Sequence, residues 1–384
     1  MKFLFVFIDM LRPNLLNICN PKENRTSLDR LINQIGGTLY TNCYTPAPDT
    51  PRSHGCLLTS RYPKDNGINN RLYYPKYFMK PDCPDFLTIL KEMGYEINIY
   101  HRPRLRNDIG QFPSSVDSCV NPNDYSFKQY VDNLKIQDNS VTYFVLDDFH
   151  RVLTAYHNQR KSLKIAFQKI TNEIEYIRER IDIDTFDLSI FFSDHGLKLR
   201  DQEYWNDGFK ALDKDRTQIF MLLRQQGDRI VVKNNKLSSI MDIFPTVLHY
   251  AGISYDSICI EGKDLFDIED SEYIIIEDHE GFSVTIGLPI SHWMVRTKNG
   301  AAYTDYKLNW QADYILSDND KDKFEKLLIE KASEFKESIE MSRILRIYER
   351  VNRSYDYYDD GTRVIEHTPI GDCLKQVVKW IIKR

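Results

Sequence analysis

Short apolar runs alternate with amphipathic stretches through most of the chain. Between several of the runs, apolar residues at helical spacing predict helices over Asp85–Met93, Ala155–Ile181 and Ser238–Tyr250. This alternation is typical of an α/β fold with a largely parallel central sheet and helices on both faces. The runs that read as buried strands are Lys2–Ile8, Gly37–Tyr40, Glu96–Tyr100, Val141–Leu146, Leu188–Phe192, Ile219–Leu223 and Tyr273–Glu277.

The pattern changes after about Leu308. Residues Asp318–Glu340 are dense in Lys and Glu at a helical period, and a basic stretch at Cys373–Arg384 predicts a final helix. A chain of 384 residues is also long for a single hydrophobic core. We therefore expect a main α/β domain over residues 1–308 and a smaller helical subdomain or lid over residues 309–384.

The composition is that of a soluble globular protein, with 42% hydrophobic and 28% charged residues. A net charge of -5 argues against a broad basic surface for nucleic acid. The 7 cysteines are scattered without a CxxC pair, which favours a reducing, cytoplasmic compartment. Asp9 and Arg12 interrupt the apolar N-terminus, and no run approaches the roughly 20 apolar residues of a membrane span. We expect a cytoplasmic protein that binds neither nucleic acid nor membrane, in an oligomeric state that the sequence leaves open.

Carboxylate and imidazole side chains stand directly after two of the predicted strands. Asp194 and His195 follow Leu188–Phe192 and Ser193, and Asp9 follows the first strand. The carboxyl ends of parallel strands meet at one edge of an open sheet, where α/β proteins build their sites. Both residue types ligate divalent metals. The alternatives are a surface turn at Asp194 and His195, and a helix cap or a salt bridge to Arg12 at Asp9.

A proline-rich segment from Thr45 to Pro51 runs into a predicted helix start. The N–H groups and dipole of a helix N-terminus favour an anion such as a phosphoryl group. A hydroxyl at this point, next to a metal, can become a nucleophile. The alternative for Thr50-Pro51 is an ordinary helix cap or turn.

Four features, in this order along the chain, resemble the alkaline phosphatase superfamily and in particular its sulfatase-like branch. They are Asp9 after the first strand, Leu57–Pro63 with Asn66–Ile68 beyond it, Ser193–Gly196, and Met241–Thr246 leading to Ala251–Ile253. The resemblance extends from Asp9 to about Lys307. It implies an alkaline-phosphatase-like fold and the chemistry of metal-dependent ester hydrolases.

The resemblance also identifies a nucleophile. Sulfatases carry a cysteine, converted to formylglycine, nine positions before the threonine of a Leu-Thr-Gly step, and nine positions before Thr59 stands Thr50. The nucleotide pyrophosphatase/phosphodiesterase branch keeps an unmodified threonine at this spacing, so Thr50 resembles its nucleophile. Asp49 is the competing candidate, because a one-residue gap would bring Pro51 into the sulfatase register.

By the same resemblance, Asp9, Thr50, Asp194 and His195 form one complete metal site. Two divalent ions are implied, Zn or Mn, with Mg or Ca if only one site forms. The candidates for a second site are Asp147 or Asp148 with His150, and His279. Three basic residues could stabilise the equatorial oxygens or protonate the leaving group, with a purely structural role as the alternative; they are Arg52, His54 and Lys198.

The implied reaction is in-line attack of a metal-bound Thr50 on a phosphoryl centre, giving a phospho-threonine that water or an acceptor alcohol resolves. The expected function is a metal-dependent phosphoester hydrolase or phosphotransferase acting on a small-molecule or glycan ester, such as a bacterial glycan or a phosphonate-type substrate. The alternatives are a sulfatase without formylglycine and a catalytically silent sulfatase-like protein.

Overall fold

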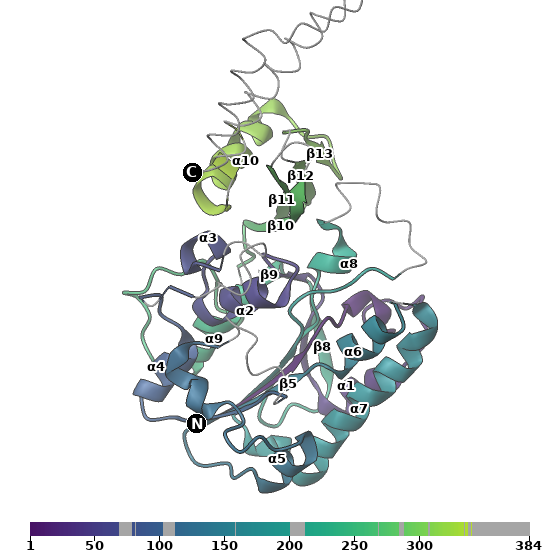
Figure 1. Ribbon diagram of the computed structural model, residues 1–384, viewed down its shortest axis with the longest axis vertical. Helices are drawn as coiled ribbons and strands as arrows, with labels where there is room; N and C mark the ends of the chain where they lie inside the picture. The colour runs from purple at the N-terminus through teal and green to yellow at the C-terminus, as the bar shows by residue number, and fades with distance from the viewer. Residues whose placement is uncertain are drawn as a thin grey trace, which may run out of the picture.

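The computed structural model describes residues 1–68, 79–80, 82–102, 112–157, 159–199, 212–267, 269–283, 288–305, 308–333, 335–336 and 339. For residues 279–283 and 288–290 it describes the backbone alone. A large central sheet lies between two layers of helices, and a smaller sheet with one helix sits against one end of it (Figure 1).

The central sheet has seven strands in the order β4-β5-β1-β6-β7-β2-β8. Strand β7 runs antiparallel to its neighbours β6 and β2, and the remaining neighbouring pairs are parallel. The predicted α/β fold with a largely parallel sheet is therefore confirmed. The strands are β1 (Lys2–Ile8), β2 (Gly37–Tyr40), β4 (Glu96–Tyr100), β5 (Ser140–Leu146), β6 (Leu188–Phe192), β7 (Met221–Gln225) and β8 (Val231–Asn234).

Strand β1 shows why both faces of the sheet are covered. Successive side chains of a strand point to opposite faces, and all six residues from Phe3 to Ile8 are buried. The odd-numbered ones pack with α2, α4 and α9, and the even-numbered ones pack with α1, α5, α6 and α7. These helices are α1 (Ser27–Ile35), α2 (Thr50–Thr59), α4 (Phe86–Glu92), α5 (Phe127–Asn133), α6 (Asp148–Ala155), α7 (Leu163–Arg180) and α9 (Ile243–Tyr250).

Two predicted helices are shorter than the periodicity indicated. The helix predicted over Ala155–Ile181 begins only at Leu163, as α7, because Ala155 is the last residue of α6 and His157 takes a left-handed φ of 55°. The stretch Ser238–Tyr250 begins as a short strand, β9 (Ser238–Ser239), which pairs with β3 (Cys43–Tyr44). The other short helices of the described residues are η1 (Pro13–Leu15), α3 (Pro63–Asn66), η4 (Ser114–Cys119), η5 (Arg160–Ser162), η6 (Ile183–Thr185), α8 (Lys214–Thr217) and η8 (Ile240–Asp242).

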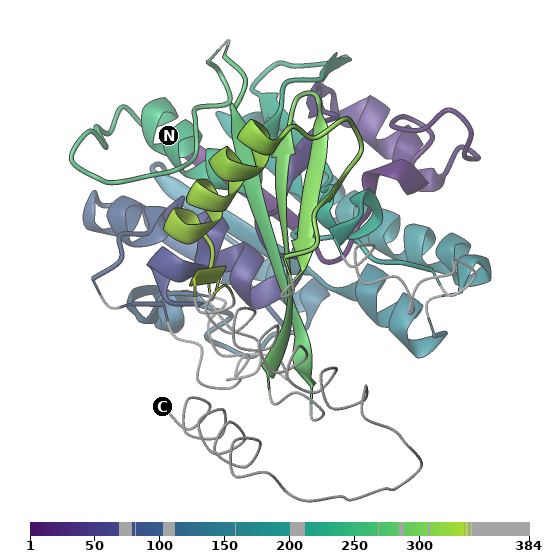
Figure 2. The same cartoon turned by 90° about the horizontal axis from the view of Figure 1, so that it is seen from above.

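The smaller sheet is antiparallel, and helix α10 (Asp318–Lys331) crosses it (Figure 2). Buried Trp293 shares a core with Phe324 and Leu328 of that helix. The predicted domain boundary at residue 308 falls inside this sheet, between β12 and β13. The predicted helix at the end of the chain lies outside the described residues. The strands are β10 (Tyr273–Ser283), β11 (Leu288–Thr297), β12 (Gly300–Asp305) and β13 (Gln311–Ala312).

No helix in the described part of the chain combines the length and apolar character needed to cross a membrane.

Candidate metal centre

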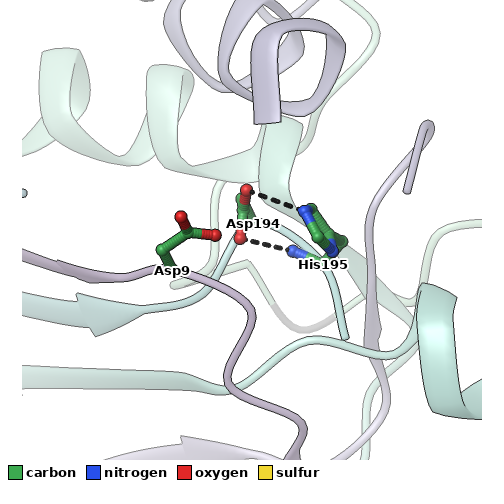
Figure 3. A group of neighbouring side chains, drawn as sticks. All are labelled: Asp9, Asp194 and His195. Carbon is green, nitrogen blue, oxygen red and sulfur yellow. Dashed lines mark hydrogen bonds and ion pairs between the residues drawn. The ribbon is translucent and has the colours of Figure 1, made fainter. Parts of the chain in front are cut away.

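Two adjacent strands deliver three potential ligands to one point. Strands β1 and β6 pair in parallel, with Phe7 opposite Phe192, so the residues that follow them emerge at the same edge of the sheet. There Asp9, Asp194 and His195 are buried, and one ligand atom from each lies within 4.8 Å of the others (Figure 3). The structure therefore brings together three of the ligands predicted from the sequence.

The hydrogen bonding of the two carboxylates suits a cation. Oδ1 of Asp194 accepts from the backbone N–H groups of Met10 at 3.0 Å and His195 at 2.8 Å. Its Oδ2 and the Oδ1 of Asp9 are buried without a hydrogen-bond partner. A buried carboxylate oxygen left in this state is costly unless a cation or a proton satisfies it. Two such oxygens beside an imidazole therefore form a donor set that fits a divalent metal.

The imidazole of His195 is held in the tautomer that a metal ligand needs. Its Nδ1 lies 2.7 Å from the carbonyl oxygen of Gly196, which can only accept a hydrogen bond. Nδ1 is therefore assigned the proton, and Nε2 keeps its lone pair. That Nε2 lies 3.4 Å from Oδ2 of Asp194, on the side of the unpartnered oxygen.

Thr50 meets this group at the first residue of helix α2. Its hydroxyl oxygen lies 3.4 Å from Nε2 of His195. The helix starts here because Asp49 caps it, accepting from the backbone N–H of Arg52 at 3.3 Å, and because Pro51 suits the first turn. Asp49 also accepts from Nε of Arg52 at 2.5 Å. The competing nucleophile candidate is thus engaged as a helix cap and an ion-pair partner.

His150 contacts the site through Asp9. Its Nδ1 lies 2.8 Å from Oδ2 of Asp9. Burial works to lower the pKa of His150, but the hydrogen bond and charge of Asp9 outweigh it and raise the pKa to about 9. Burial alone would raise the pKa of Asp9. The hydrogen bond and the charge of His150 outweigh burial, so the pKa of Asp9 is lowered. His150 therefore donates a hydrogen bond to the carboxylate of Asp9. Burial raises the pKa of Asp194.

Asp147 and Asp148, the other described candidates for a second metal site, are not part of the group that Asp9, Asp194 and His195 form. Asp147 and Asp148 both pair with Arg102. Asp148 also faces Arg151 at 3.5 Å and Lys169 at 3.9 Å, so cationic side chains already surround it. The side chain of His279 lies outside the described residues.

The three basic candidates have different surroundings. Arg52 is fully buried and pairs with Asp49 and Asp278. His54 stacks on Phe7 with ring centroids 5.6 Å apart, and its Nε2 lies 2.5 Å from the hydroxyl of Tyr143. Lys198 pairs with Asp213, which caps α8. These contacts suit structural roles, and a catalytic role for each of the three stays a prediction.

The sequence interpretation missed residues that border the site. His101 directly follows β4 and is buried, and its charge helps to lower the pKa of Asp9. The strand-end rule that located Asp9 would have located His101 as well. Asp278 and Arg216 also lie close to the start of α2, but Asp278 is 226 residues from its partner Arg52. No local sequence signal identifies a pair at that separation.

Comparisons with known proteins support the fold. No model of a known protein family matches the chain, and no curated protein sequence matches it. A Bacteroides thetaiotaomicron protein reported with the metabolism of multiple glycosaminoglycans superposes with a TM-score of 0.61 at 16% identity, covering 89% of this chain and 99% of its own. Phosphonate monoester hydrolase from Silicibacter pomeroyi gives 0.58 at 13% identity, covering 95% and 98%. A 2-O GAG sulfatase gives 0.54 at 13% identity, covering 95% of each chain.

The chain therefore has the fold of sulfatases and phosphonate monoester hydrolases, which is the fold of the alkaline phosphatase superfamily. The fold implied by the sequence resemblance is confirmed. The threonine nucleophile stays a prediction, because identities of this size carry no residue roles.

Proposed function

We propose that the protein is a metal-dependent phosphoester hydrolase or phosphotransferase that uses Thr50 as its nucleophile. The observation that carries the proposal is the position of the Thr50 hydroxyl, 3.4 Å from Nε2 of His195 at the N-terminus of α2. A hydroxyl at this point lies beside a donor set that fits a divalent cation and at the positive end of a helix dipole.

The residues of the site divide the work. Oδ1 of Asp9, Oδ2 of Asp194 and Nε2 of His195 would hold the cation. When bound, it would supply Lewis acidity that lowers the pKa of the Thr50 hydroxyl and screens the charge of an anionic ester. Thr50 Oγ gives up its proton to solvent and forms a bond to phosphorus as the bond from phosphorus to the leaving-group oxygen breaks. The leaving group takes up a proton from solvent, and a phospho-threonine remains. Water or an acceptor alcohol releases the phosphoryl group and restores the hydroxyl.

The substrate that we favour is a small-molecule or glycan phosphoester or a phosphonate ester, and the site of action that we favour is the cytoplasm. Fold relatives that include phosphonate monoester hydrolase support an ester of a tetrahedral anion. An imidazole among the ligands favours Zn over Mg or Ca, which prefer oxygen ligands throughout, and the two carboxylates also suit Mn. A second cation would need ligands besides Asp9, Asp194 and His195.

A sulfatase that works without formylglycine is the second candidate. It is supported by the sulfatase among the structures that share the fold. Turnover of 4-nitrophenyl phosphate and 4-nitrophenyl sulfate, measured with Mn²⁺ or Zn²⁺ added, separates the two functions. Faster turnover of the sulfate would overturn the phosphoester proposal, and no turnover of either would favour a catalytically silent protein.

The mechanism is tested on Thr50→Val. We expect this variant to lose turnover and to retain Mn²⁺ binding in calorimetric titration, because the other ligands remain. Acid-quenched wild-type protein should contain phosphorylated Thr50 by peptide mass spectrometry. Thr185→Val is the matched control, since the Thr185 hydroxyl bonds to the Asp182 carbonyl oxygen in η6, near the opposite edge of the sheet. Near-normal activity of Thr50→Val would exclude Thr50 as the nucleophile. Asp49 would then be the remaining candidate, or the proposed mechanism would be wrong.

A further inference from the structure

A chain of four charged side chains, of which Asp49, Arg52 and Asp278 are buried and Arg216 is partly exposed, connects the start of α2 to the smaller sheet. Arg52, two residues after Thr50, is fully buried. Its Nη2 lies 3.1 Å from Oδ1 of Asp278 on β10. The other oxygen of that carboxylate, Oδ2, lies 2.6 Å from Nη1 of Arg216 in α8. At its opposite end the chain closes on Asp49, the N-cap of α2.

Arg216 contacts the loop that carries the metal ligand His195. Its backbone carbonyl oxygen accepts from the N–H of Gly196 at 2.8 Å, and Gly196 directly follows His195. A Cβ built on Gly196 would lie 2.1 Å from the carbonyl oxygen of Asp215, so the loop is pressed against α8 and requires glycine. A shift of α8 would therefore be passed to His195.

Asp278 is the junction between these two supports. Through Arg52, Asp278 holds the turn at which Thr50 begins α2. Through Arg216, it holds the loop at Gly196 that directly follows His195. Its side chain is 1% exposed, so water does not compete for its oxygens. Guanidinium groups bind carboxylates in a defined direction, which an apolar contact between the same elements would not impose.

We propose that Asp278 is a positioning residue that sets the separation between the Thr50 hydroxyl and Nε2 of His195. Its effect on rate rests on the proposed function, whereas its effect on geometry does not. A buried ion pair contributes little net stability over an apolar replacement, but it can specify one arrangement of the elements that it joins. A nucleophile displaced by about 1 Å loses on the order of 100-fold in rate.

The test compares Asp278→Asn with Asp184→Asn. Asp184 is the matched control, because it also pairs with two arginines, Arg224 and Arg229, but in η6. With 4-nitrophenyl phosphate and Mn²⁺ we expect Asp278→Asn to lower kcat about 100-fold while KM stays near the wild-type value. Asp184→Asn should change stability and leave kcat unaltered.

Two further measurements keep the proposal falsifiable. Arg216→Met removes one of the two arginine contacts of Asp278 and keeps the carboxylate, so it should lower kcat in the same direction as Asp278→Asn but by less. An unchanged kcat in Arg216→Met would count against the positioning role. Crystal structures of the wild type and Asp278→Asn should show the Thr50 hydroxyl displaced from His195 while Asp9 and Asp194 stay in place. An unmoved Thr50 would overturn the positioning role. Absence of wild-type turnover would overturn the proposed function alone, because the displacement can still be measured.

Discussion

The two carboxylate oxygens of Asp194 have different surroundings. Oδ1 is held by two backbone N–H groups, and Oδ2 is buried without a hydrogen-bond partner. An asparagine would place a neutral oxygen or an amide N–H group at the cation. We expect Asp194→Asn to weaken Mn²⁺ binding more than about 100-fold in calorimetric titration, since loss of an outer partner alone costs 10- to 100-fold. Asp187→Asn is the control, because Asp187 accepts from the N–H of Lys2 at 2.7 Å, at the far end of β1. Equal affinity in the two variants would exclude Asp194 as a ligand.

His150 is a residue for which the structure suggests a different role from the predicted one. Because it donates to Oδ2 of Asp9, it would orient that ligand. Asparagine can place an N–H group near the position of Nδ1, so His150→Asn should bind Mn²⁺ more tightly than His150→Ala and with the wild-type stoichiometry. The number of ions bound decides between the roles. A lower stoichiometry in both variants would show that His150 ligates a second cation.

At the scale of single elements, Asp242 connects the start of α9 to the loop that follows it. Its carboxylate is buried and accepts from the N–H groups of Ser239 at 2.8 Å and Lys263 at 2.9 Å. Burial raises its pKa to about 6. The folded protein therefore binds this proton more tightly than the unfolded chain, whose aspartate pKa is about 3.9. The contribution of Asp242 to stability should thus be fully present at about pH 4 and below, and it should be lost as the pH rises through about 6.

Urea unfolding of the wild type and Asp242→Asn at several pH values checks this expectation. The difference in unfolding free energy should shrink between about pH 4 and pH 6, by up to about 1.4 kcal/mol per pH unit, and then level off. A difference that does not change with pH would show that Asp242 titrates normally.

The elements that the sequence predicted well are those with a strong local cause. Continuous apolar runs marked the strands and their ends, and this was enough to place Asp9, Asp194 and His195 at one edge. The break between α6 and α7 carries no glycine or proline, so it could not be predicted from residues 156–162. The strand order also has no local signal. It sets β1 between β5 and β6, and this brings His150, which follows β5, to Asp9.

At the scale of the whole molecule, the site depends on contacts between distant parts of the chain. The smaller sheet joins the main body next to α2, where the N–H of Glu277 donates to the carbonyl oxygen of Pro46 at 2.9 Å. Asp278, the next residue, pairs with Arg52 and Arg216. Truncation within this sheet would therefore disturb the turn that presents Thr50, although the metal ligands come from residues 1–195.

Metal binding should stabilise the entire fold, because the ligands lie just beyond the ends of β1 and β6, two strands in the middle of the central sheet. A ligand that binds only the folded state at a hundredfold excess over its Kd adds about 2.7 kcal/mol to the free energy of unfolding. We expect Mn²⁺ at that excess to raise the thermal midpoint of the wild type and EDTA to reverse the rise. Asp194→Asn should show neither effect at the same concentration, whereas Asp187→Asn should show both. If neither Mn²⁺ nor Zn²⁺ changes the thermal midpoint of the wild type, the site does not bind these metals. The proposed activation of Thr50 by a metal would then be excluded as well.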